Sequence, residues 1–387
     1  MHSRPEPSLH FLSYALAIVG YMTLMLTMPL TSAIASSLQV KTGTLHLGIS
    51  LLYFLFSLSA ILLSMLSDIF GAYRILKYAQ LTSIAGLALL ANAQEVTVFY
   101  LGCVLVGSGT GCYSSIGRSV MLRHSHNPEH IKKRTAILSL AIIVAPILSF
   151  TLARSMIPSN WRYAYYIMMI IELTTLFFSQ YALRGDYQPL TNIRCVLHVW
   201  LKYISTRSCL LNMLSTGVGY ALILQTIIGN FHNILKPHTN LTYLQVNLLA
   251  FGLSVFYIIG IATFRKVINS PRLPFTRIIL TSLLPVSLLL YIFHHSSPTA
   301  TLIALYGTCY IIGFLNPLSS SFAMAEIKEG QGMASALLTF SFAFTSAMYS
   351  FIQGYFEIPI QQFLPLSLGF SFFALFTISI LLKKYQF

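Results

Sequence analysis

Residues 46–70 read HLGISLLYFLFSLSAILLSMLSDIF, and this stretch decides the fold class. It contains no Lys, Arg, Asp or Glu before Asp68, near its end. A hydrocarbon core about 30 Å thick is crossed by about 20 mostly apolar residues in a helix. Inside that core every backbone N–H and C=O group must be paired within the segment. The stretch therefore predicts a transmembrane helix.

Eleven further apolar stretches extend this pattern over nearly the whole chain, and the sequence predicts an all-α membrane protein with twelve transmembrane helices. Only 8% of the residues are charged and 56% are hydrophobic, against about 25% charged residues in a soluble domain. A β-barrel is excluded because the apolar residues are consecutive rather than alternating. The first stretch is too long for a cleaved signal peptide and is expected to remain as a helix. The expected spans are Leu9–Ser37, His46–Phe70, Ile75–Ala93, Val98–Leu122, Thr135–Met156, Trp161–Leu183, Ser208–Leu235, Tyr243–Phe264, Leu273–His294, Pro298–Ala325, Gly332–Phe356 and Ile360–Leu382.

The longest polar connection divides these spans into two sets of six. We expect an N-terminal six-helix bundle over residues 1–183, a cytoplasmic linker over 184–207 and a C-terminal six-helix bundle over 208–387. Two halves of six spans are typical of secondary transporters built from repeats, whose substrate site lies between the halves near the middle of the membrane.

The basic residues predict the orientation. Of the 23 lysines and arginines, eighteen, including Arg277, are assigned to one side of the membrane. Four are assigned to the other side, and Arg118 lies near the end of a span; the four are Lys41, Arg154, Arg162 and Lys236. Cations concentrate on the cytoplasmic side of a membrane, so both termini are expected in the cytoplasm. The net charge of +14 is attributed to contact with anionic membrane lipid rather than with nucleic acid.

Three of the spans carry stripes of polar side chains, which must face protein or water because unpaired polar groups are unfavourable in hydrocarbon. One reading is that these stripes line a substrate cavity. The other is that they form hydrogen bonds between helices and contact no ligand. The side chains chosen as cavity candidates are Thr23, Thr27, Gln225, Asn230, Tyr306 and Asn316.

Glu172 is the one acid placed deep within a span, and we regard it as the candidate for proton coupling. Tyr165, Thr175 and Ser179 share its helix face and are expected to be its polar neighbours. Burial favours the neutral form of a carboxyl group, which allows a membrane acid to carry a proton. A purely structural carboxyl group, bonded to a neighbouring helix, is the competing interpretation.

A cytoplasmic gate is expected at the inner ends of the second, third and fourth spans. Asp68, Gly71 and Arg74 form a short turn, and the Asp68 carboxylate could meet a helix N-terminus or a cation such as Arg118. The alternative is a solvated charge at a helix end, which contributes little. The glycines of the fourth span, Gly107, Gly109 and Gly111 among them, are expected to allow close helix packing.

Several short motifs resemble those of a known family. Residues 64–74, SMLSDIFGAYR, resemble the G-x-x-x-D-R-x-G-R-R/K loop signature of the major facilitator superfamily. Residues 117–120 (GRSV), 145–148 (APIL), 160–162 (NWR) and 332–338 (GMASALL) resemble the Bcr/CflA type of drug-resistance transporters within it. The resemblance implies a fold of two six-helix bundles, alternating access by a rocker switch, and proton-driven multidrug efflux.

The chain also departs from that pattern. Met25 stands where these exporters usually have an aspartate, and Cys103 stands where the fourth span usually has a buried arginine. An importer or facilitator of a specialised metabolite, such as a siderophore or an amino acid, therefore remains open as the alternative to efflux.

Motifs of enzymes are missing from the sequence: it contains no H-E-x-x-H, no G-x-S-x-G and no P-loop. His124, His126 and His130 lie in a polar inner loop and are interpreted as solvated. We therefore expect a transporter without enzymatic activity, cofactor or metal. Its expected partners are a small-molecule substrate, membrane lipid and, as candidate coupling ion, protons, and its expected location is the bacterial inner membrane.

Overall fold

All regular secondary structure in the described part of the chain is helical. The computed structural model describes residues 6–123, 144–157, 159–184, 205–235, 243–268, 273–294, 297–325 and 331–383, together with residues 241 and 270. Residues 135–143 of the fifth expected span, most of the expected linker and His124, His126 and His130 lie outside these ranges.

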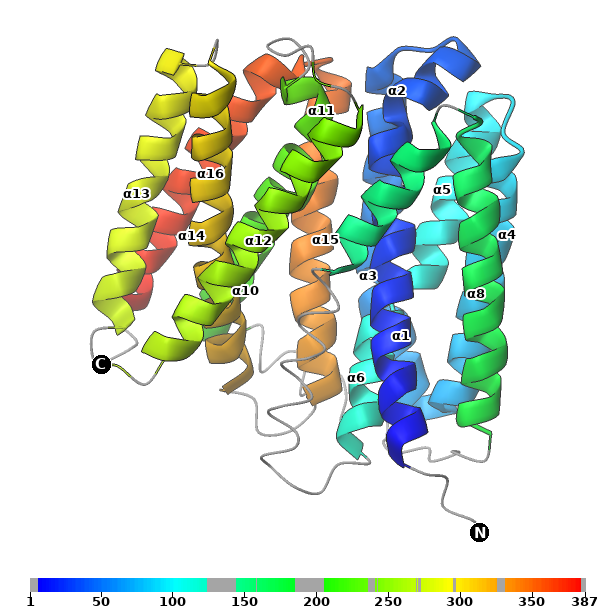
Figure 1. Cartoon of the computed structure of the whole chain (residues 1–387). Helices are drawn as coiled ribbons and strands as arrows, with labels where there is room; N and C mark the ends of the chain where they lie inside the picture. The colour runs from blue at the N-terminus through cyan, green and yellow to red at the C-terminus, as the bar shows by residue number, and fades with distance from the viewer. Residues whose placement is uncertain are drawn as a thin grey trace.

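The helices follow the expected spans closely (Figure 1). The N-terminal half contains α1 (Glu6–Met25), α2 (Thr27–Leu38), α3 (Thr42–Phe70), α4 (Ala72–Ala91), α5 (Val96–Thr110), α6 (Tyr113–Arg123), a helix over Val144–Met156, and α8 (Arg162–Ala182). The C-terminal half contains α10 (Arg207–Tyr220), the π-helix η1 (Ala221–Ile228), α11 (Gly229–Leu235), α12 (Tyr243–Val267), α13 (Leu273–His294), α14 (Pro298–Ala325), α15 (Gln331–Tyr355) and α16 (Ile360–Lys383).

Nine helical stretches among the described residues are long and apolar enough to cross a membrane. The other three expected spans contain α4, α8 and the short helix Val144–Met156. The first two turns of α4 contain Arg74 and Lys77, and α8 contains Glu172. These polar side chains reduce the mean hydropathy of α4 and α8. The number twelve stays a prediction.

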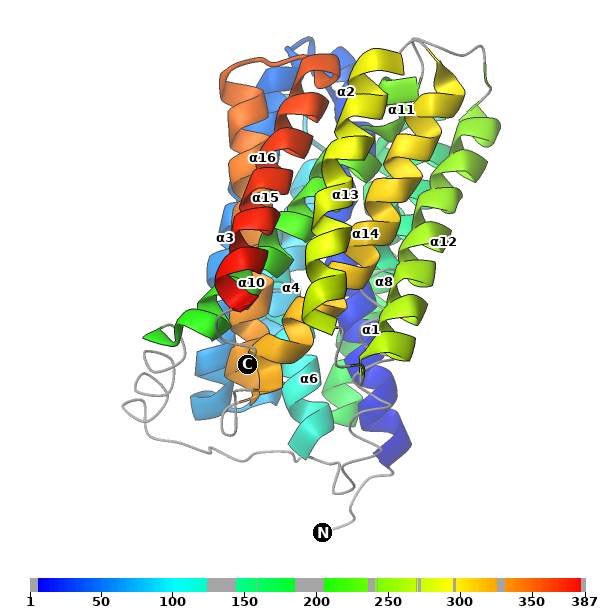
Figure 2. The same ribbon diagram turned by 90° about the vertical axis from the view of Figure 1, so that its left-hand side faces the viewer.

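The start of α1 and the end of α16 both point towards the same end of the helix assembly, as the two views in Figure 1 and Figure 2 show. We call this the inner end and the opposite one the outer end. The two halves contact each other chiefly through α15, which packs along α3 and also contacts α6. At the outer end, Ser350 Oγ donates a hydrogen bond to the His46 carbonyl oxygen at 3.0 Å.

Glycines set the closest helix contacts in both halves. A Cβ atom on Gly107 would lie 2.3 Å from the Leu52 carbonyl oxygen, and one on Gly111 would lie 2.1 Å from that of Phe56, so α5 packs directly on α3. A Cβ atom on Gly313 of α14 would likewise overlap the Tyr257 carbonyl oxygen of α12, so α14 packs directly on α12. The predicted packing role of the glycines in the fourth span is confirmed.

We expect Gly313→Ala to destabilise the protein, because its methyl group would overlap the backbone of α12. Overpacking of this kind costs about 1–3 kcal/mol. Gly307→Ala on the same helix is the matched control, since its methyl group would meet only Ser287 Oγ at 3.5 Å. Thermal unfolding in detergent should show a clearly lower melting temperature for Gly313→Ala alone. Equal melting temperatures for the two variants would contradict this packing account.

Candidate functional site

Two membrane-spanning segments are interrupted at equivalent positions in the two halves. The first breaks at Leu26, where α1 ends and α2 begins, and Pro29 follows within the first turn of α2. The seventh contains the π-helix η1, in which backbone hydrogen bonds join residues five apart instead of four. π-Helical turns occur frequently at functional sites, and interrupted segments in corresponding places of two repeats indicate the binding site of a transporter.

The two interruptions touch each other across the interface between the halves. Gln225 Nε2 of η1 donates to Met28 Sδ of α2 at 3.4 Å. The Gln225 carbonyl oxygen accepts a hydrogen bond from Asn230 Nδ2 at 3.0 Å, while Gln225 Oε1 is buried without a partner. A buried amide oxygen that the protein leaves unpaired is available to a ligand or to water.

A cleft of about 630 Å³, which we call the outer cleft, opens beside this contact at the outer end. Both halves line it with polar groups, and it is large enough for a small organic molecule. Two of its buried lining atoms, Gln353 Oε1 and His46 Nδ1, have no hydrogen-bond partner. Its lining residues include Met28, Thr31, Ser32, Thr42, His46, Asn230, Asn233 and Gln353.

An ion pair joins the halves at the mouth of the outer cleft. Lys41 Nζ lies 2.9 Å from Glu357 Oε2, and both side chains are largely exposed. It is the one ion pair formed between residues within the described ranges. Exposed pairs contribute little to stability, so this contact is suited to opening and closing.

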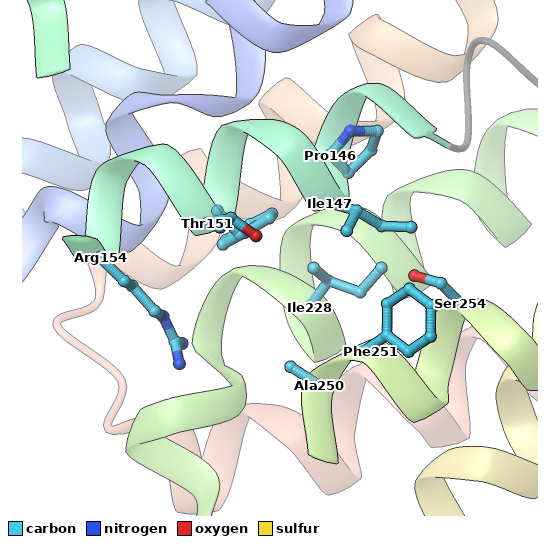
Figure 3. Close-up of a pocket in the computed structure, with 9 residues that line it drawn as sticks. Pro146, Ile147, Thr151, Arg154, Ile228, Ala250, Phe251 and Ser254 are labelled. Carbon is cyan, nitrogen blue, oxygen red and sulfur yellow. The ribbon is translucent and has the colours of Figure 1, made fainter. Parts of the chain in front are cut away.

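There are two smaller hollows besides the outer cleft, and Arg154 lines both of them. The first, of about 240 Å³, shares Met28, Ser32 and Asn233 with the outer cleft. The second, of about 60 Å³, lies where Ile147 and Thr151 face Ile228 and Phe251 of the other half (Figure 3). Arg154 is 7% exposed and lies within a helix, which corrects its assignment to an outer loop.

A second group of side chains, which we call the central cluster, lies deeper between the halves. The Phe342 ring of α15 is 5.6 Å from the ring of Tyr21 in α1 and 5.6 Å from that of Tyr220 in α10. Ser114 Oγ of α6 and Thr339 Oγ1 of α15 are 3.4 Å apart. The remaining members are Phe56, Arg118, Tyr257 and Asn316.

Glu172 is fully buried inside the N-terminal half. Ser83 Oγ of α4 donates to its Oε1 at 2.8 Å, and Tyr113 of α6 donates to its Oε2 at 3.2 Å. Thr23 Oγ1 lies 3.4 Å from Oε1 and also donates to the Val19 carbonyl oxygen. Because these neighbours are neutral hydroxyl groups, the site can hold either a carboxylate or a carboxylic acid.

The expected neighbours of Glu172 on its own helix bond elsewhere. Tyr165 donates to Thr27 Oγ1, Ser179 donates to Gln80 Oε1, and Thr175 donates to the backbone of its own helix. That expectation was wrong, because residues on one face of a helix lie beside each other while the partners of Glu172 come from the helices opposite.

The structure divides the six cavity candidates among different environments. Asn230 lines the outer cleft and Gln225 lies beside it, whereas Thr23 and Thr27 bond within the N-terminal half. Tyr306 donates to the Leu249 carbonyl oxygen at 2.9 Å and stacks on Phe256, which ties α14 to α12. Asn316 Nδ2 donates to the Tyr257 hydroxyl at 3.2 Å, and its Oδ1 is buried without a partner.

The expected gate residues lie in two places. Gly71 has a φ of 89° and ends α3, and α4 begins at the next residue, so Asp68 and Arg74 flank one tight turn. Arg118 is buried in α6 and forms no ion pair with Asp68. It belongs to the central cluster instead.

Arg277 is a buried cation that sequence reasoning missed. It was counted among the inner-side cations, at the start of the expected span Leu273–His294. It lies in the second turn of α13 and is 1% exposed. Its guanidinium donates to neutral oxygens of α10, α14 and α16 at 3.2–3.3 Å, and these belong to Asn212, Ser215, Ser319 and Ser379. Spacing within α13 alone gives no sign of this, because all four acceptors are distant in sequence.

Comparisons with known proteins agree with this architecture. The family model described as Major Facilitator Superfamily matches residues 11–350. The crystal structure of peptide transporter POT in complex with sulfate superposes with a TM-score of 0.73 at 15% identity, covering 99% of this chain and 94% of that chain. The human organic anion transporter MFSD10 (TETRAN) superposes with a TM-score of 0.64 at 13% identity, covering 97% of this chain and 100% of that chain. At such identities the likeness shows the fold alone, and no curated relative matches the sequence.

The outer cleft should be reachable by a water-soluble reagent from one side of the membrane. Asn233 is exposed and lines it, so Asn233→Cys in sealed vesicles should react with an impermeant maleimide added on that side. Ser346→Cys is the matched control, because Ser346 is fully buried on α15; the wild-type protein reports the background of the native cysteines. Failure of Asn233→Cys to react from either side would contradict an open cleft.

Proposed function

The chain belongs to the major facilitator superfamily, and from that premise we propose that it moves a small organic solute across the membrane by alternating access, in the direction of efflux. Transport across a membrane follows from the family, whose members are transporters rather than enzymes. The observation that carries the cargo proposal is the outer cleft, which both halves line at the level of two interrupted segments.

The proposed architecture has twelve spans in two six-helix bundles, with boundaries at residues 1–183, 184–207 and 208–387. Both termini are placed in the cytoplasm of a bacterial inner membrane, in line with the asymmetric cations. Two features support rocking of the halves about a central site. The Lys41–Glu357 pair joins them at the outer end, and the Gly71 turn lies at the end of α3 furthest from that pair. Asp68, Gly71 and Arg74 form the proposed cytoplasmic gate there.

The alternative to efflux is import or facilitated diffusion of a metabolite without proton exchange. Met25 and Cys103, at the positions where related exporters carry charged side chains, are both fully buried. Met25 Sδ accepts a hydrogen bond from the Tyr53 hydroxyl at 3.0 Å, so an uncharged side chain occupies that position. If protons are coupled, another group has to carry them, and Glu172 is the proposed one.

The direction of transport can be measured in everted membrane vesicles. We expect a proton gradient, acidic inside, to drive accumulation of amphipathic dyes in vesicles that contain the protein and not in empty ones. The gradient should be discharged as cargo enters. Accumulation of amino acids rather than dyes, or transport that ignores the gradient, would favour the importer or facilitator.

Glu172→Gln should make transport independent of pH, because an amide keeps the shape and hydrogen-bonding capacity of a neutral carboxyl group but cannot exchange a proton. Counterflow, which needs no net proton movement, should survive. Glu95→Gln is the matched control, because Glu95 is an exposed acid at the start of α5. Transport rates should be recorded from pH 5 to 8. If the pH profile of transport by Glu172→Gln matches that of the wild-type protein, Glu172 has no role in coupling, while the proposed transport function is unaffected.

A further inference from the structure

Arg118 is a buried cation for which the described chain supplies no counter-charge. It lies in the second turn of α6 with 8% of its surface exposed. Its Nε atom is buried without a hydrogen-bond partner, and none of the described acids forms an ion pair with it. The acids whose side chains are described are Asp68, Glu95, Glu172 and Glu357.

Arg277 provides a contrast within the same protein. It is also buried, with 1% of its surface exposed, but its guanidinium donates to four oxygen atoms. A guanidinium remains protonated in proteins, and a charge held away from water without partners is strongly unfavourable. A ligand that brings its own negative charge would relieve this at Arg118.

The groups around Arg118 have the chemistry of a binding site. The hydroxyl groups of Tyr21 and Tyr220 lie within electrostatic range of its guanidinium, one from each half. Ser114, one helical turn before Arg118, faces Thr339 of the C-terminal half. The ring of Phe342 lies beside both tyrosine rings. A cation, several hydroxyl groups and apolar ring faces therefore meet at one place.

We propose that Arg118 anchors the cargo, and that the cargo is a small organic anion with one carboxylate, sulfonate or phosphate group on an aromatic or apolar body. The inference rests on the proposed transport function and names its substrate class. The planar guanidinium binds such groups through two parallel hydrogen bonds, and the tyrosine hydroxyl groups add donors. The rings of Tyr21, Tyr220 and Phe342 contact the apolar body.

A single anchoring cation selects against polyanions as well as against neutral molecules. Arg118 is the one cation of the central cluster, so a second negative charge on the cargo would be buried without compensation. Since Tyr21 and Tyr220 belong to different halves, a bound anion that accepts a hydrogen bond from both also connects the two halves. Movement of one half against the other would remove one of the two hydroxyl groups from the anion and weaken its binding.

The test uses purified full-length protein and three pairs of probes that differ mainly in charge. The pairs are benzoate and benzamide, benzenesulfonate and benzenesulfonamide, and phenyl phosphate and phenol. Calorimetric titration of the wild-type protein should give at least one anion a dissociation constant about tenfold or more below that of its neutral partner. Arg118→Gln should abolish this preference. Arg118→Lys should retain part of it, because lysine keeps the positive charge but cannot form the two parallel hydrogen bonds of a guanidinium.

Arg162→Gln is the matched control, since Arg162 is a cation at the outer start of α8 that stacks on Trp161. It should keep the wild-type preference. Tyr21→Phe provides a second probe if Arg118→Gln fails to fold, and it should weaken anion binding several-fold while leaving neutral probes unchanged. Circular dichroism and thermal unfolding verify each variant.

Three results would overturn the proposal: no charge preference in any wild-type pair, an undiminished preference in Arg118→Gln, or equal weakening of anionic and neutral probes. The last would assign Arg118 to the gate, where it affects every cargo alike. Counterflow with the same probes separates this from the broader function. If Arg118→Gln exchanges the anionic probes as well as the wild-type protein does, the anion anchor is removed and transport itself is left standing.

Discussion

Polar groups between membrane helices can be satisfied only by the protein or by what it binds, because the hydrocarbon offers no hydrogen bonds. Much of this structure follows from that constraint. Glu172 is surrounded by hydroxyl groups from three helices, and Arg277 by four neutral acceptors. Buried polar atoms at the interface between the halves that lack a partner within the protein are therefore candidates for binding a ligand. They include Gln225 Oε1, Gln353 Oε1 and Arg118 Nε.

A second consequence concerns how the helices hold together. Burial of apolar side chains gives little drive for association within lipid, so close backbone contact must supply it. Gly111 lets α5 approach α3, and Gly313 lets α14 approach α12 in the equivalent part of the other half. Between the halves, α15 packs along α3, and Gly43 and Gly354 bring these two helices close together near the outer end. The exposed Lys41–Glu357 pair contributes little to this contact.

The sequence was sufficient to predict the helices, because long apolar stretches have few alternatives once lipid is the surrounding medium. It also predicted a buried acid at Glu172, which is fully buried, whereas the coupling role of Glu172 and the cavity role of Gln225 and Asn230 remain predictions. It did not reveal that Arg154 and Arg277, each near the end of an expected span, are buried. For Arg277 the reason is that its acceptors lie on other helices, which the sequence does not place beside it. For the same reason, Tyr306 was expected at a cavity but bonds to a neighbouring backbone. The predicted gate at Asp68 and the twelve-span count remain predictions.

The two charged groups at the centre of the protein are separate sites that share the same two helices. Thr23 of α1 and Tyr113 of α6 contact Glu172, while Tyr21 of α1 lies near Arg118 of α6. Gly20 of α1 packs directly against Tyr113, and Ser13 of α1 donates to the Gly117 carbonyl oxygen at 2.7 Å. Any displacement of α6 along α1 therefore changes the surroundings of both charges at once. A proton on Glu172 and an anion at Arg118 would each neutralise one buried charge. Both events would therefore affect the same movement of α6 relative to α1. Coupling between them then requires no direct contact, only that α1 and α6 prefer different relative positions when the two charges are neutralised.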